Sequence, residues 1–290
     1  MVIFKRLNFH TTRAMIASMS DDLAKVGAGA AALGLLYKVL GPSAQVFGDK
    51  LAFWTGEGLK HLENILQRAL AKTPPESADK PTRVSYRIAK SLVVDAPFCD
   101  DEICAEYFGG ILASSRTEGQ RDDRGVSYLA QINRLSSHQL RCHYVLYRAA
   151  QELGVAYWTR FEKPRPPTPA FAYIPETGLI SSMSLDGLTK DQASTILRHS
   201  LFGLEREGFL GEHWSCTGIR QSRLAISSSE LIGRGLIFHP SPQGIELYQW
   251  GYGRGQSSVE DFLEKAAEYP ALKGIPSIGG CKAIGAHPML

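Results

Sequence analysis

The chain has 290 residues, a length that accommodates one large domain or two ordinary ones and buries a sizeable core. Hydrophobic residues make up 44% and charged residues 21%, proportions that exclude a disordered or fibrous chain. The formal net charge of +3 is far below the basic excess that binding to a nucleic-acid backbone usually needs.

Neither the cysteines nor the N-terminus indicates secretion. The five cysteines are odd in number and widely spaced, at Cys99, Cys104, Cys142, Cys216 and Cys281. We therefore predict reduced thiols, no disulfide and a cytoplasmic protein. Residues 1–20 lack the continuous apolar run of a signal peptide, and we expect residues 1–25 to form a poorly ordered leader.

Residues 26–37 (VGAGAAALGLLY) carry no charge and are rich in Gly and Ala. A spanning helix needs about 20 consecutive apolar residues, so this run is too short to cross a membrane. Two interpretations remain for residues 26–70: small-residue helices packed closely in a core, or an amphipathic surface that lies on the inner membrane. We favour the packed core.

Further helices are predicted up to about residue 153. Leu59, Leu62, Ile65, Leu66 and Leu70 recur with helical spacing, and the helix stops at Thr73-Pro74. Others are expected over residues 84–92, after the acidic start at residues 100–102, over residues 126–133, and after the capping box of Ser136 and Gln139. These elements predict an antiparallel helical domain at residues 26–160.

The composition changes at residues 163–169, where four prolines predict a stiff, extended boundary segment. We assign residues 161–187 to this linker and a strand, 188–255 to a winged-helix-like α+β module, and 256–290 to a helix and a loose tail. Within the module, Ser241 and Pro242 suit a helix start. The predicted fold class is thus mainly α, with a helical array followed by a small winged-helix-like module.

Two groups of residues are candidates for reactive or metal-binding sites. Cys99, Cys104, His138 and Cys142 resemble an incomplete zinc set, in which the first two converge only if Cys99 precedes the helix. We favour small buried thiols. The acidic residues are Asp100, Asp101, Glu102, Glu106, Asp122 and Asp123, the last two flanked by Arg121 and Arg124. We interpret them as helix-start charges and a salt-linked turn.

We accordingly assign no catalytic, cofactor-binding or metal residue, and expect no cofactor and no enzyme activity. An enzyme site built from Asp122, Asp123 and His138 ranks third among the functional hypotheses. DNA binding by the 188–255 module is disfavoured because residues 187–255 carry seven Lys/Arg against six Asp/Glu, although Arg220, Arg223 and Arg234 allow a local cluster.

Several segments carry a family resemblance: the Gly/Ala-rich helix, Leu40-Gly41-Pro42, residues 101–115 (DEICAEYFGGILASS), Leu135-Ser136, Gly235-Leu236-Ile237 and residues 242–247 (PQGIEL). From about residue 30 to residue 253, the chain resembles the bacterial Abi-alpha (abortive infection alpha) family. The resemblance implies defence against phage, in which an infected cell halts growth or dies before the phage matures. It supplies no catalytic motif.

Two classes of function follow. The first is a non-enzymatic defence protein whose helices at residues 26–70 are packed at rest and act on a membrane surface or a protein partner after infection. The second is a sensor or regulator that binds a phage component, a partner protein or DNA through residues 188–255. A protein partner or self-association is expected in either case, and the sequence identifies no small-molecule substrate.

Overall fold

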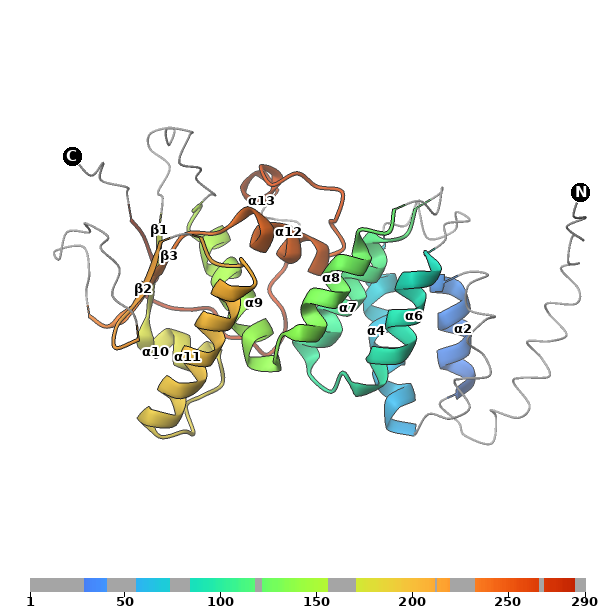
Figure 1. Ribbon diagram of the computed structural model, residues 1–290, viewed down its shortest axis with the longest axis horizontal. Coiled ribbons are helices and arrows are strands. Elements are labelled where there is room, and N and C mark those ends of the chain that lie inside the picture. Colours follow the sequence, from blue (N-terminus) through green and yellow to red (C-terminus); the bar gives the residue numbers. More distant parts are fainter. Residues whose placement is uncertain are drawn as a thin grey trace, which may run out of the picture. The chain divides into compact units, whose positions relative to one another are not determined.

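The computed structural model describes residues 29–40, 56–73, 84–117, 122–155, 171–211, 213–219, 233–265 and 269–284. In these residues the protein is mainly helical, with ten α-helices and a four-stranded antiparallel sheet (Figure 1). The helical prediction is thus confirmed. The leader, residues 163–169, Arg121, Arg220 and Arg223 lie outside the described ranges.

The chain divides into two compact units, residues 1–126 and 127–290. This boundary lies upstream of the predicted one at residues 163–169. The boundary precedes α9 (Ser137–Glu152) because this helix packs within the second unit. It contacts α11 (Lys190–Arg206), α12 (Pro242–Gly251) and β1 (Phe171–Pro175).

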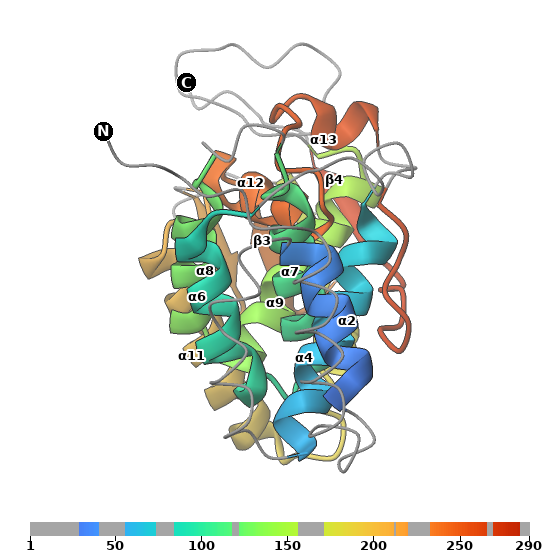
Figure 2. The ribbon, with the colours of Figure 1, turned by 90° about the vertical axis from the view of Figure 1, so that its right-hand side faces the viewer.

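The first unit contains a bundle of helices. Its elements are α2 (Gly29–Leu40), α4 (Gly56–Lys72), α6 (Tyr86–Asp95), the 3₁₀ turn η2 (Ala96–Phe98) and α7 (Glu102–Ser114). The amphipathic pattern predicted for residues 59–70 is confirmed for Leu59, Leu62, Ile65 and Leu66, which are buried, whereas Leu70 is half-buried and Ala69 takes the last buried position. Figure 2 shows α2 beside α4, against which it packs.

The Gly/Ala-rich helix also buries its apolar side. Leu36, Val39 and Leu40 of α2 have exposed fractions of 1% or less, whereas Gly34 and Lys38 face solvent. This agrees with the packed-core interpretation for the described part of residues 26–70. Among the helices that the structure describes, none has the length and hydrophobicity to cross a membrane.

The second unit combines helices with the sheet. It contains most of α8 (Gly125–Arg134), then α9, β1, α10 (Glu176–Ser182), α11, β2 (Trp214–Cys216), β3 (Gly235–Phe238), α12, α13 (Asp261–Glu264) and β4 (Lys282–Ile284). The predicted caps are confirmed: Ser136 and Gln139 form a capping box on α9, and Ser241 caps α12.

The sheet has the order β2-β3-β1-β4, and its strands are antiparallel. The loose tail expected within residues 256–290 is therefore wrong in part, because β4 pairs with β1 through Ala172 and Ala283. An open strand edge leaves backbone donors and acceptors unpaired, and β4 satisfies those of β1. The sheet thus includes strands on both sides of residues 188–255.

Gly109 marks the closest approach of α4 and α7. A Cβ atom there would lie 2.7 Å from the Cβ of Arg68 and 3.1 Å from the backbone oxygen of Ile65. We expect Gly109→Ala to push the helices apart and to lower the free energy of unfolding of the first unit by about 1–3 kcal/mol. Chemical denaturation measures this.

Gly34→Ala is the matched control, since a Cβ at this helical position would meet no atom within 4 Å. It should keep or raise stability by up to about 1 kcal/mol, because Ala favours a helix more than Gly does. Equal midpoints for the two variants would contradict the close α4–α7 contact.

Candidate functional site

A cluster of charges joins α4 to α7 in the first unit. Glu106 of α7 forms ion pairs with both Arg68 and Lys72 of α4, the second at 2.5 Å. The three side chains are between 16% and 19% exposed, so water reaches them only partly. Lys72 also donates to the backbone oxygen of Glu106 at 2.8 Å, and Arg68 donates to Asn64 at 2.9 Å.

Burial and charge act in opposite directions on the pKa of Lys72 in this cluster. Burial lowers the pKa of Lys72, and the carboxylate of Glu106 opposes this shift. Removing Glu106 leaves Lys72 without its carboxylate and leaves Arg68 with only the exposed Glu102 at 3.7 Å, which costs more than the loss of a surface pair. The arrangement therefore holds the apolar face of α4 against α7 through charge as well as shape.

The predicted cysteine pair does come together at the start of α7. Cys99 precedes this helix, as convergence of the two cysteines required, and its thiol donates to the backbone oxygen of Asp101 at 3.7 Å. The neighbouring Cys99 thiol, together with burial, raises the pKa of Cys104, so the Cys104 thiol stays protonated and is a weak nucleophile or metal ligand. All five cysteines lie in the described residues, and none forms a disulfide.

The other half of the predicted zinc set is not assembled on α9. His138 is exposed, whereas Cys142 is fully buried, so the two side chains do not share a surface. Burial raises the pKa of Cys142. Within the described ranges, no group of three or more His, Cys, Asp or Glu side chains is arranged to hold a metal ion.

The acidic residues have structural partners. Asp101 accepts from the backbone nitrogen of Cys104 at 2.9 Å and caps α7. Asp122 pairs with Arg124 at 2.7 Å, and Asp123 pairs with Arg87 at 2.9 Å. The helix-start interpretation is confirmed for Asp101 and the salt-linked turn for Asp122. Asp123 instead pairs with α6, and the helix-start interpretation is wrong for Glu106, which is largely buried against α4.

In the second unit, α9 carries a buried polar row that the sequence reasoning missed. His143, Tyr147 and Gln151 recur every four residues on the face that packs in the core. Nε2 of His143 lies 3.1 Å from the backbone oxygen of Gly244, to which it donates. This four-residue spacing of polar side chains on a predicted helix is the signal that sequence reasoning could have used.

Tyr147 and Ser241 complete the network. The hydroxyl of Tyr147 donates to the backbone oxygen of Phe209 at 2.9 Å and accepts from the nitrogen of Ser241 at 3.0 Å. The hydroxyl of Ser241 donates to Gly208 at 2.7 Å, so its proton is not directed at His143. These contacts tie α9 to α12 and do not form a nucleophile–base pair.

Burial lowers the pKa of His143 to about 3, opposed by its hydrogen bond to Gly244, and raises the pKa of Tyr147. Both side chains are therefore neutral at neutral pH. Their rings are stacked with centroids 4.4 Å apart, and Phe209 meets His143 edge-on. The network is a structural element of the core.

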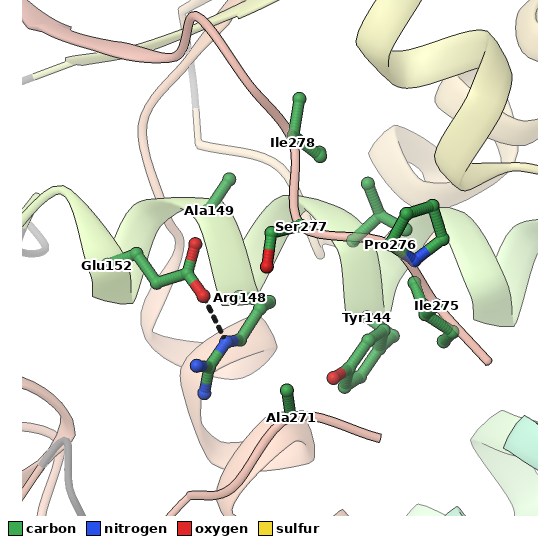
Figure 3. A pocket seen from close by; sticks show the side chains of 10 residues that line it. Tyr144, Arg148, Ala149, Glu152, Ala271, Ile275, Pro276, Ser277 and Ile278 are labelled. Atoms are coloured by element: carbon green, nitrogen blue, oxygen red, sulfur yellow. Dashed lines mark hydrogen bonds and ion pairs between the residues drawn. The ribbon is translucent and has the colours of Figure 1, made fainter. Parts of the chain in front are cut away.

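A small pocket lies along α9 and the segment of residues 271–278 (Figure 3). Its volume of 20 Å³ holds about one water molecule. Polar groups at its edge already have partners: Arg148 donates to Glu152 at 2.6 Å, and the nitrogen of Leu272 donates to the hydroxyl of Tyr144 at 2.9 Å. The hydrogen bond between Leu272 and Tyr144 thus holds the C-terminal segment against α9. The space left between them is too small for a substrate.

Comparison with known proteins finds no matching family model, no matching curated protein and no matching solved structure.

His143 makes the stability of the second unit pH-dependent. Its pKa is depressed in the folded state, so the neutral ring stabilises the fold above pH 6.5 and this contribution is lost as the pH falls from 6.5 towards 3. At pH 5 the loss is about 2 kcal/mol relative to pH 8.

Urea denaturation of the wild type and His143→Gln at both pH values measures this contribution. Gln retains a side-chain donor for Gly244 but does not titrate, so we expect lower stability at pH 8 and a smaller decrease towards pH 5. The same decrease in both proteins would refute the assignment.

Proposed function

We propose that the protein is a non-enzymatic bacterial anti-phage defence protein of the abortive-infection type, as its resemblance to the Abi-alpha family implies. The observation that carries the proposal is the junction of α4 with α7, where Glu106 pairs with Arg68 and Lys72 and Gly109 lets the two helices approach closely. The first unit supplies the active surface, and the packed arrangement is its resting state.

The free energy of apolar burial keeps the stripe on α4 covered until another apolar surface is available. Full burial of a Leu or Ile side chain contributes roughly 1.5–3 kcal/mol, and α4 buries four of them, Leu59, Leu62, Ile65 and Leu66. Because α4 packs against α2 and η2 as well as α7, this stripe requires a new apolar contact once α4 separates from these neighbours. A protein partner or the surface of the inner membrane provides one.

Glu106→Gln tests the proposal. The change removes the charge that Arg68 and Lys72 share and destabilises the junction by about 3 kcal/mol. We expect wild-type cells to survive without phage and to die on infection while the culture is protected. Cells that express Glu106→Gln should stop growing without phage, as measured by plating and growth curves.

Two controls separate release from general instability. Glu57→Gln removes an exposed ion pair with Lys60 on the same helix and should behave as wild type. His143→Gln destabilises the second unit and should not arrest growth. Absence of protection by the wild-type gene against a broad phage panel would refute the defence function, and unchanged liposome leakage and cell permeability would refute the membrane route alone.

For residues 188–255 we propose, as the alternative function, a winged-helix-like sensor that binds a partner protein, a phage component or DNA. The order α11, β2, β3, α12 with antiparallel β2 and β3 supports this proposal. Arg234 is paired with Glu176 at 2.5 Å, which reduces the basic cluster considered for DNA. We expect no salt-sensitive shift of duplex DNA in a gel-shift titration, and such a shift would favour the DNA sensor.

A further inference from the structure

The outer face of α6 and η2 carries an apolar row that is exposed to solvent. Tyr86, Val94 and Phe98 are 57%, 51% and 83% exposed, and they follow one another at multiples of four residues with Lys90 between them. The opposite face of α6, with Ile88, Ala89, Leu92 and Val93, is buried. A row with this spacing is the ridge that interlocks in the most common class of helix packing.

The charges along this row are polarised. Arg87 and exposed Lys90 lie at the end with Tyr86, whereas Asp95 and exposed Asp100 lie at the end with Phe98. Arg87 contacts Asp123 in a pair that is largely open to water, so it still attracts an external carboxylate. An anionic membrane would be repelled by the acidic end, and so would DNA.

We propose that this face pairs with the same face of a second copy of the chain, the two α6 helices running antiparallel about a two-fold axis that passes between Lys90 and Val94 of the exposed row. Tyr86 then meets Phe98 of the second copy, and Arg87 approaches Asp100 of the second copy. A two-fold axis forms each of these contacts twice, and the polarised charges make the face complementary to itself.

The row from Tyr86 to Phe98 is about 18 Å long at 1.5 Å per residue. So short a contact is smaller than those of permanent dimers, which places the pair in the weak, concentration-dependent class. The aromatic side chains are the expected anchors, because aromatic residues dominate binding at the centre of such interfaces. The pairing does not require the proposed defence function.

Sedimentation velocity of the full chain over a range of concentrations tests the pairing. We expect a monomer–dimer equilibrium whose dissociation constant rises at least about tenfold in Tyr86→Ala/Phe98→Ala. Leu188→Ala, which removes an exposed apolar side chain of the second unit, should leave it unchanged. Circular dichroism checks that each variant is folded. A wild type that stays monomeric at millimolar concentration would overturn the proposal, as would unchanged association of the double variant.

Charge exchange tests the antiparallel geometry. Arg87→Glu places like charges at both contacts of its own dimer, and Asp100→Lys does the same. Each variant alone should therefore be monomeric at concentrations where the wild type is dimeric. An equimolar mixture restores opposite charges at both contacts and should dimerise like the wild type. A mixture that remains monomeric would overturn the antiparallel arrangement.

Discussion

The need to pair buried polar groups governs how the second unit is built. The side chains of His143 and Tyr147 are completely buried on α9, and an unpaired donor in such a place costs about 1–3 kcal/mol. Their partners are backbone groups of Phe209, Ser241 and Gly244. Because backbone groups have fixed directions, these hydrogen bonds determine where the chain re-enters the core after α11 and where α12 begins.

Glycine makes these bonds possible. A Cβ atom at Gly244 would lie 1.8 Å from the hydroxyl oxygen of Tyr147, so only glycine allows α12 to begin against α9. Ser241 serves the same junction twice, since its hydroxyl caps α12 at Gly244 and donates to Gly208. Helix capping and tertiary packing are therefore one set of contacts here.

Local signals in the sequence sufficed for the helices and their ends. Helical spacing located α4, the pair Ser136 and Gln139 located the start of α9, and Ser241 located that of α12, because each signal acts within a few residues. The pairing of β4 with β1 joins residues about 110 positions apart and leaves no local pattern. The junction of Glu106 with Arg68 and Lys72 escaped for the same reason, although both basic residues lie one turn apart on a predicted helix.

The two units respond differently to separation of their helices. When α9 leaves α12, His143 and Tyr147 exchange neutral hydrogen bonds for water, and Tyr147 loses its ring contact with Tyr248 of α12. When α4 leaves α7, Glu106, Arg68 and Lys72 regain full hydration, which offsets much of the lost ion pairing. The ion pairs between α4 and α7 therefore add less to the free energy of helix separation than the buried hydrogen bonds and ring contacts between α9 and α12 do. Burial of apolar side chains is then the main force that keeps α4 in place, so a partner that offers an equivalent apolar surface competes directly with α2, η2 and α7 for the apolar surface of α4.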